Sequence, residues 1–237
     1  MIKPDYISSK DWTILNEKYK EEELISFFEQ NYPYQYLIGD VDFCDSKILV
    51  NESVLIPRFE TEGLVYKLVE LIKEKKLAYD TILDIGTGSG CIIIALAKLL
   101  NESYDAIDLS NAALEVASKN AKLNEVEIHF EQKDILHETI EKEYDIVVSN
   151  PPYVRKDEEV GLSTKYEPQI ALFAEDNGLE FYKKIMNNTK AKVYAFEIGC
   201  TQKQELMDYA KSIFQNATLL CEKDLAGLDR YFFIINE

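Results

Sequence analysis

Apolar and polar residues follow two different rhythms in the first third of the chain. Residues 9–31 carry apolar side chains at helical spacing among charged ones, which predicts a helix that starts near Ser9. Residues 36–57 instead alternate apolar and polar positions around an Asp-Ser dipeptide, a pattern that predicts a β-hairpin. A second helix is expected over residues 61–76. The chain should therefore begin with a short helical segment and a hairpin ahead of a larger domain.

From residue 81 onward, short apolar runs alternate with segments of helical periodicity. Strands are expected at 81–86, 104–109, 126–132, 144–149, 192–199, 217–222 and 230–236, and helices at 91–100, 111–123, 178–189 and 201–214. This alternation is typical of an α/β fold with a mostly parallel sheet and helices on both faces. In such sheets ligands bind beyond the carboxyl ends of the strands. Functional residues are therefore expected where strands end.

Composition restricts the broad class of protein. The chain has 237 residues, 46% of them hydrophobic, which suffices for one large domain and a small appendage. No apolar run reaches the length of about eighteen residues that predicts a membrane span. The first residues also lack the basic-then-apolar pattern of a signal peptide. Four scattered cysteines and two histidines favour a reduced, cytoplasmic protein without a metal site.

The excess of acidic residues argues against nucleic acid as a partner. There are 43 acidic and 26 basic side chains, a net charge of −17. Proteins that bind nucleic acid unaided usually present a basic face, because neutralising phosphate supplies much of the affinity. No direct nucleic-acid binding is therefore expected, although a local basic patch would escape this average and acidic balance also serves solubility.

The first strand of the α/β region ends in a glycine loop. Gly86-Thr87-Gly88-Ser89-Gly90 has glycines at alternate positions, which let the backbone turn tightly and approach a ligand closely. The spacing is GxGxG and not the GxGxxG of dinucleotide sites, where a pyrophosphate must fit. It suits an uncharged body pressed against the backbone, as in S-adenosylmethionine. A plain glycine-rich turn remains the alternative at this point.

Acidic residues follow the next two strands. Asp108 is placed to accept both ribose hydroxyls of an adenosine. Ser110 is the better N-cap of the following helix, which would leave Asp108 free for a ligand. After the third strand, Asp134 could accept from an adenine amino group and Ile135 could pack on the ring. A surface turn is an equally good explanation for Asp134.

The fourth strand ends in an unusual corner, Asn150-Pro151-Pro152-Tyr153. Proline has no N–H for the ladder, so the strand must stop here. Methylation of a planar NH₂ nitrogen requires acceptors that grip both N–H bonds. The side-chain carbonyl of Asn150 and the rigid main-chain carbonyl of Pro151 could do so, with Tyr153 as an aromatic wall. A rigid turn would explain the prolines but not their neighbours.

Seven segments together resemble one family. They are residues 33–43, 54–65, 83–97, 145–154, 166–185, 197–199 and 223–230. Each segment is unspecific alone, but the set resembles the release-factor glutamine methyltransferases (the PrmC or HemK family). These belong to the class I S-adenosylmethionine-dependent methyltransferases. The resemblance extends from about residue 33 to the C-terminus.

The resemblance implies a fold, a domain division and a reaction. The fold would be Rossmann-like, with a seven-stranded mostly parallel sheet over residues 58–237. A short helical segment (1–33) and a hairpin linker (34–57) would precede it. The enzyme would methylate the side-chain nitrogen (N5) of the glutamine in the GGQ motif of class 1 peptide-chain release factors. S-adenosylmethionine would be the methyl donor and S-adenosylhomocysteine the product.

The residues and the resemblance together give a list of site residues. The cofactor contacts expected are Gly86, Thr87, Gly88, Ser89, Gly90, Asp108, Asp134, Ile135 and Asn150. The substrate glutamine is expected to contact Asn150, Pro151, Pro152 and Tyr153, with Asn150, Pro151 and Tyr153 as the catalytic set.

Three departures from the family pattern stand out. Ile135 stands where an aromatic residue is common, and Phe59 replaces a second proline. About thirty residues precede the hairpin, fewer than is usual, so release-factor docking is expected to use a smaller surface. The helical segment could be a reduced docking module or a cover for the hairpin. The roles of Arg58, Glu60 and Glu197 do not follow from the sequence.

Three other functions compete with the first. A sister branch with the same corner would methylate a glutamine of a ribosomal protein. A nucleic-acid base N-methyltransferase would share the corner too, but the net charge of −17 argues against it. A cofactor-binding protein without catalysis is the third alternative.

Overall fold

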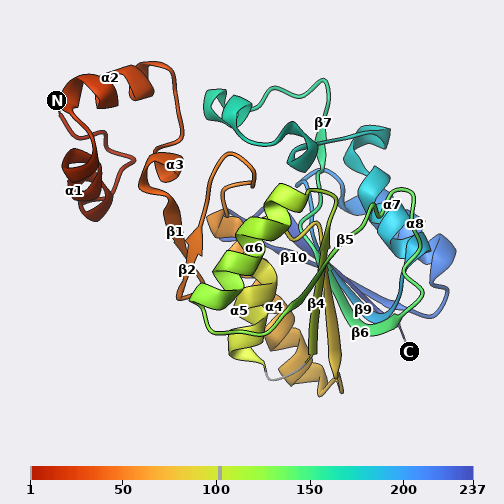
Figure 1. The fold of residues 1–237 in the computed structure, drawn as a ribbon. Coiled ribbons are helices and arrows are strands. Elements are labelled where there is room, and N and C mark those ends of the chain that lie inside the picture. The colour runs from red at the N-terminus through yellow and green to blue at the C-terminus, as the bar shows by residue number, and fades with distance from the viewer. Residues whose placement is uncertain (1, 101–102, 237) are drawn as a thin grey trace.

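The computed structural model describes residues 2–100 and 103–236 (Figure 1). Met1, residues 101–102 and Glu237 belong to the predicted domain ranges but lie outside the described residues. A central sheet flanked by helices forms the body of the protein, and the short helices α1, α2 and α3 lie to one side of it. None of the helices in the described part of the chain has the length and apolarity that a bilayer span requires.

The central sheet has seven strands in the order β10-β11-β9-β6-β3-β4-β5. Their bounds are β3 Thr81–Ile85, β4 Ser103–Asp108, β5 His129–Gln132, β6 Glu143–Ser149, β9 Lys190–Glu197, β10 Thr218–Lys223 and β11 Asp229–Ile235. Only β11 runs antiparallel to its neighbours, β9 and β10. The predicted α/β fold with a seven-stranded mostly parallel sheet is confirmed.

Helices cover both faces of this sheet (Figure 1). Buried residues along the strands alternate between the two cores that lie between the sheet and these helices. One core joins Ile82 and Val148 to helices α4 (Phe59–Lys75), α5 (Cys91–Leu99) and α6 (Asn111–Leu123). The other joins Leu83 and Val147 to α7 (Glu180–Asn188) and α8 (Lys203–Ile213). Neighbouring residues of a strand point to opposite faces, so a continuous apolar run fills both cores.

The order of the strands brings two predicted site segments together. The chain passes from β3 through β4 to β5 and then returns to β6 on the other side of β3. In the parallel pair of β3 and β6, Asp84 lies opposite Val148. The glycine loop and the proline corner therefore leave adjacent strands at the same edge of the sheet. This is the switch point where α/β proteins bind ligands.

The N-terminal segment differs from the single helix that was predicted. It contains α1 (Ser9–Lys18), α2 (Glu21–Glu29) and α3 (Tyr34–Ile38). The first helix does start at Ser9, and Ser8 caps it, because the Ser8 Oγ accepts from the Asp11 amide. Folding back between α1 and α2 lets the chain bury a small core of its own. This core comprises Ile7, Leu15, Leu24, Leu37 and Ile38.

The predicted hairpin is present but shorter than expected. β1 (Asp40–Phe43) pairs antiparallel with β2 (Ser46–Leu49). The turn lies at Cys44-Asp45, where both residues have positive φ, as two-residue hairpin turns require. The first residues assigned to the hairpin belong instead to α3.

A long connection between β6 and α7 carries small elements that the sequence pattern did not predict. Strands β7 (Val154–Arg155) and β8 (Phe173–Ala174) pair in parallel. The 3₁₀ turns η1 (Leu162–Tyr166), η2 (Gln169–Ala171) and η3 (Asp176–Gly178) complete it. We call residues 156–176 the cover loop, because part of it lines the pocket described below.

Candidate active site

The glycine loop lies at the carboxyl end of β3 and exposes backbone atoms to a pocket. Gly86 and Gly88 have φ of 69° and 54°, and a Cβ added to either would meet no atom within 4 Å. Both line a pocket of about 300 Å³. Gly90 has φ of 81°, but a Cβ there would lie 3.2 Å from the Ala117 Cβ. Gly90 therefore serves the packing of α5 against α6, while Gly86 and Gly88 face the pocket.

The two side chains within the loop turn inward. Thr87 and Ser89 are buried, and neither is among the residues that line the pocket. Thr87 Oγ1 donates to Asp84 Oδ2 at 2.7 Å, and the Ser89 carbonyl accepts from Asn120 Nδ2 at 2.8 Å. Burial raises the pKa of Asp84 to about 7. The hydrogen bonds to Asp84 and Asn120 fix the loop on the side away from the pocket. Any cofactor contact by Thr87 or Ser89 would therefore be through the backbone.

Asp108 closes the other side of the loop. Its Oδ2 accepts from the Gly88 amide at 2.9 Å and its Oδ1 from the Ser110 amide at 2.8 Å. Ser110 caps α6 as predicted, with its Oγ accepting from Ala113 N. The sequence predicted that the Asp108 carboxylate would be free, whereas both of its oxygens accept from backbone amides. Burial raises its pKa against the opposing effect of these amides. Each oxygen keeps acceptor capacity for a ligand.

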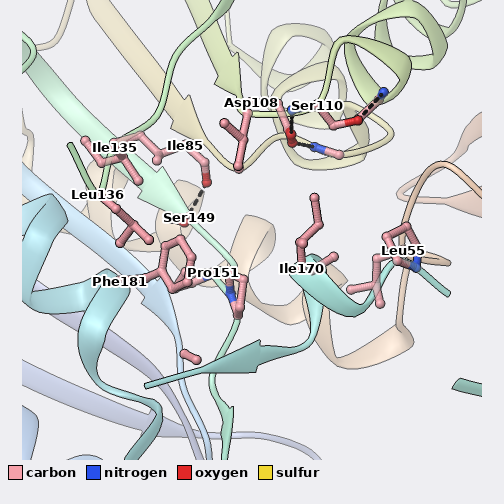
Figure 2. Close-up of a pocket in the computed structure, with 18 of the residues that line it drawn as sticks. Leu55, Ile85, Asp108, Ser110, Ile135, Leu136, Ser149, Pro151, Ile170 and Phe181 are labelled. Carbon is pink, nitrogen blue, oxygen red and sulfur yellow. Dashed lines mark hydrogen bonds between the residues drawn. The ribbon is translucent and has the colours of Figure 1, made fainter. Parts of the chain in front are cut away.

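Apolar side chains line two sides of the same pocket. Figure 2 shows Ile135, Leu136 and Phe181 on one side of the pocket and Leu55 and Ile170 on the other. The sequence reasoning found Ile135 but missed Phe181, which comes from α7. An aromatic ring is therefore present in the pocket, although Ile135 replaces the one that the family pattern led us to expect.

Asp134 lines the same pocket, yet its carboxylate is engaged locally. Its Oδ1 accepts from the Leu136 amide at 3.0 Å, and its Oδ2 lies 2.8 Å from His137 Nδ1. This geometry is that of a turn acid. Its predicted contact with an adenine amino group stays a prediction.

The proline corner forms the floor of the pocket next to the glycine loop. Asn150, Pro151 and Pro152 line it, and Ser149 Oγ donates to the Ile85 carbonyl at 2.6 Å (Figure 2). Asn150 Nδ2 donates to Thr61 Oγ1 at 3.1 Å. Within the described ranges, no group donates to Asn150 Oδ1 or to the Pro151 carbonyl. These are the two acceptors that the sequence predicted.

Tyr153 lies behind the corner and is not among the pocket-lining residues. Its hydroxyl donates to Glu197 Oε1 at 3.2 Å, and its carbonyl accepts from Gln202 Nε2 at 3.1 Å. The ring packs with the core on the α7 and α8 side of the sheet. Phe181 and Pro151 both line the pocket, so an aromatic ring on this surface comes from α7 and not from Tyr153 as expected. The substrate-binding role of Tyr153 therefore stays a prediction, and its observed contacts brace the corner.

Arg58 ties the cover loop to the hairpin side of the molecule. Its guanidinium lies 2.5 Å from Glu167 Oε1, and Glu167 Oε2 accepts from the Ile56 amide at 3.0 Å. The Glu167 side chain is 1% exposed, so this ion pair is shielded from water on one side. The pairing positions the stretch from Pro168 to Ala171 along the pocket.

Glu60 contributes a main-chain carbonyl, which accepts from the Tyr231 hydroxyl.

The pocket as a whole fits S-adenosylmethionine. Glycines 86 and 88 leave open backbone where a side chain would intrude. Asp108 provides acceptors at the end of β4, and Ile135, Leu136 and Phe181 provide apolar surface for a flat ring. No basic cradle for phosphate is needed for such a ligand.

Comparison with known proteins places the chain in a family. A family model described as "methyltransferase small domain" matches residues 66–166. A release factor glutamine methyltransferase of Flavobacterium psychrophilum is 43% identical over 97% of this chain and 81% of its own length. Those of Lactococcus lactis and Bacillus subtilis are 40% and 38% identical, over 92% and 91% of this chain and 84% and 79% of their own lengths. The chain belongs to the release factor glutamine methyltransferase family. The resemblance of the seven segments is confirmed.

Two solved structures with a similar fold share less sequence identity with this chain than the relatives above. The hMettl16 catalytic domain in complex with a MAT2A 3′UTR hairpin matches with a TM-score of 0.61 at 18% identity, over 80% of this chain and 74% of that one. A ribosomal protein L11 methylase of Lactobacillus delbrueckii matches with 0.51 at 19% identity, over 80% and 86%. At these identities the likeness supports the methyltransferase fold alone.

Proposed function

We propose that this member of the family transfers a methyl group from S-adenosylmethionine to the side-chain nitrogen of the glutamine in the GGQ motif of a class 1 release factor. The observation that carries the proposal is a pair of acceptors at the corner, Asn150 Oδ1 and the Pro151 carbonyl, which accept no hydrogen bond from any described residue and lie beside a glycine loop. Relatives at 38–43% identity carry the name of this activity.

The corner can compensate for the weak nucleophilicity of a side-chain amide nitrogen by fixing its orientation. Its lone pair is delocalised, so the nitrogen is a poor nucleophile unless it is held and aimed. Two fixed acceptors would take its two N–H groups and point the nitrogen at the methyl donor. S-adenosylmethionine, when bound, supplies a methyl on a sulfonium with a good leaving group. The nitrogen would gain the methyl as the methyl–sulfur bond breaks, neutral S-adenosylhomocysteine would leave, and the nitrogen would release one of its protons to solvent. The chain contributes orientation and fixed dipoles, which can supply about 7–11 kcal/mol in well-aligned reactions.

The cofactor and the partner follow from the same proposal. The tRNA methyltransferase of Pyrococcus abyssi, whose fold matches with a TM-score of 0.52, was solved with S-adenosylhomocysteine. We expect the same product here, with Gly86, Gly88 and Asp108 as contacts. A net charge of −17 supports a protein rather than a nucleic-acid substrate. We further propose that the helices before residue 39 contribute to docking this substrate.

A labelling experiment tests the function directly. The protein is incubated with methyl-labelled S-adenosylmethionine and a class 1 release factor, either wild type or with GGQ changed to GGA. Label is expected in the wild-type factor alone, on the tryptic peptide that contains the motif. Equal labelling of both factors would overturn the proposal. Labelled ribosomal protein or naked rRNA, with an unlabelled release factor, would favour the competing functions.

A further inference from the structure

A buried carboxylate lies directly behind the proline corner. Glu197 ends β9, is 2% exposed, and was left without a role by the sequence. Its Oε2 accepts from the Thr61 hydroxyl at 2.7 Å, and its Oε1 accepts from the Tyr153 hydroxyl at 3.2 Å. Thr61 lies in the first turn of α4 and is itself 2% exposed. One carboxylate thus connects α4, β9 and the corner.

The direction of these hydrogen bonds determines how the Asn150 amide is turned. A threonine hydroxyl has one proton, and Thr61 donates it to Glu197. Towards any other group the Thr61 oxygen can only accept. The group that lies 3.1 Å from it must therefore be the Asn150 NH₂ and not the Asn150 carbonyl. The amide oxygen is left for the pocket, which Asn150 lines.

We propose that Thr61 and Glu197 are positioning residues that set the orientation of the Asn150 amide, so that its oxygen and not its NH₂ meets the nitrogen to be methylated. The proposal rests on the proposed function and deepens it. The two ends of an asparagine amide are nearly equal in size but opposite in hydrogen-bonding role. A reversed Asn150 would set a donor against the N–H of the substrate and remove one of its two acceptors.

The contacts distinguish this arrangement from a simple tie between helix and sheet. A tie would need only the bond from Thr61 to Glu197. Here the Thr61 oxygen is also an acceptor for a residue of the pocket, so each bond defines the direction of the next. Since both Thr61 and Glu197 are buried, water does not compete for these groups.

The main test replaces the hydroxyl and keeps the shape. Thr61→Val removes both hydrogen-bonding functions, Thr61→Ser retains them, and Thr189→Val is the matched control. Thr189 is also buried and its hydroxyl donates to the Ile185 carbonyl at 2.7 Å, but it precedes β9 at the opposite edge of the sheet. We measure kcat and KM for release-factor methylation, the Kd for S-adenosylmethionine, and Tm.

Thr61→Val is expected to lower kcat about ten- to hundredfold, as loss of a well-placed hydrogen bond does, with less than about a twofold change in cofactor Kd. Thr61→Ser should recover most of kcat, and Thr189→Val should lower Tm without lowering kcat. Equal kcat values for Thr61→Val and Thr189→Val would overturn the proposal, because a purely structural bond affects Tm alone.

Glu197→Gln gives a second variant should Thr61→Val not fold. Glutamine has one acceptor oxygen for two hydroxyl donors, so its NH₂ faces either Thr61 or Tyr153, and that hydroxyl must accept from the NH₂ instead of donating. We expect kcat to fall between the values of Thr61→Ser and Thr61→Val. A kcat within about twofold of wild type, in a variant whose Asn150 side-chain NH₂ signal is shifted, would contradict the proposal.

A spectroscopic readout separates this proposal from the proposed function. The Asn150 side-chain NH₂ pair is assigned in a ¹⁵N–¹H spectrum by its absence in Asn150→Ala. Thr61→Val should shift this pair and speed its exchange with water, and Thr189→Val should not. If the wild-type protein labels no release factor, the proposed function fails while this result still stands. If the pair is unchanged in Thr61→Val, the positioning role fails whatever the substrate is.

Discussion

The two halves of the pocket are built in different ways. In the glycine-loop half, the Gly88 amide donates to the carboxylate of Asp108, which lies 20 residues further along the chain. In the corner half, Asn150 is held by Thr61 and through it by Glu197, which lies 136 residues from Thr61 in the sequence. The first half depends on local backbone conformation, whereas the second depends on distant segments meeting correctly.

Substitutions in the two halves of the pocket should therefore change different constants. Changes in the glycine-loop half should affect cofactor binding. Changes in the corner should affect turnover, because its acceptors are needed when the methyl group moves. Four substitutions test this division, beginning with the largest expected effect.

Asn150→Ala should have the largest effect, and on turnover. Removing one fixed polar group from an active site typically costs about 10²–10³ in kcat. We expect a loss of that size in release-factor methylation, measured with saturating cofactor, and only a small change in the Kd of S-adenosylmethionine. The exposed Asn187, which donates to Tyr209 on the α7 and α8 side, serves as the control when changed to Ala. Full activity of Asn150→Ala would remove the corner from the mechanism.

Gly178→Ala tests the dependence of the corner on distant contacts. Gly178 has φ of 83°, and a Cβ there would lie 2.1 Å from the Tyr153 carbonyl oxygen. Gly227 has a similar φ of 79° but open space around it. The backbone strain is shared, at about 1–2 kcal/mol, so only the clash differs. We expect Gly178→Ala to lower the free energy of unfolding in urea by at least about 2 kcal/mol more than Gly227→Ala. Equal losses would show that Gly178 does not support the corner.

Asp108→Asn should act on the other half. The amide keeps one acceptor and gains a donor that faces the amides of Gly88 and Ser110. We expect the Kd of S-adenosylmethionine, measured by calorimetry, to rise about tenfold, the size of one weakened charged hydrogen bond. With saturating cofactor, kcat should stay within about threefold of wild type. A large fall in kcat with an unchanged Kd would break the division between the halves.

Asp145→Asn should change neither half, although Asp145 lies on the strand that ends in the corner. Burial opposes its ionisation, but Lys192 at 2.6 Å and the amides of Asp80 and Thr81 outweigh that and lower the pKa to about 2. A carboxyl with a lowered pKa stabilises the folded state above its unfolded pKa of about 3.9. That stability is lost as pH falls from about 4 to about 2.

Urea unfolding across this window measures the effect. The variant should be less stable than wild type at pH 7 and should lose less stability between about pH 4 and pH 2. Asp157→Asn, whose side chain is 77% exposed, is the control. The same pH dependence in Asp145→Asn and wild type would show that another group is responsible. Altered kcat or cofactor Kd in Asp145→Asn would show that effects travel along β6.

Local patterns predicted the elements better than their junctions. The alternation of apolar runs gave the correct α/β class and strand sequence, because each strand between two helical layers must be apolar on both faces. The same reasoning joined α1 and α2 into one helix. Their separation depends on the small core of Leu15 and Leu24, which forms only when the two helices fold against each other.

The site shows the same contrast residue by residue. The sequence by itself predicted Gly86, Gly88, Asp108, Asn150 and Pro151 as site residues, and all five line the pocket. A glycine loop, a strand-end acid and a proline corner can each be recognised from a few neighbouring residues. Three features depend on the tertiary structure. The Thr87 and Ser89 side chains are buried, Tyr153 lies behind the corner, and Phe181 of α7 lines the pocket. The tertiary structure also joined Thr61 to Glu197. Hydrogen-bond partners separated by more than a hundred residues leave no local pattern, since their meeting depends on how every intervening strand and helix packs.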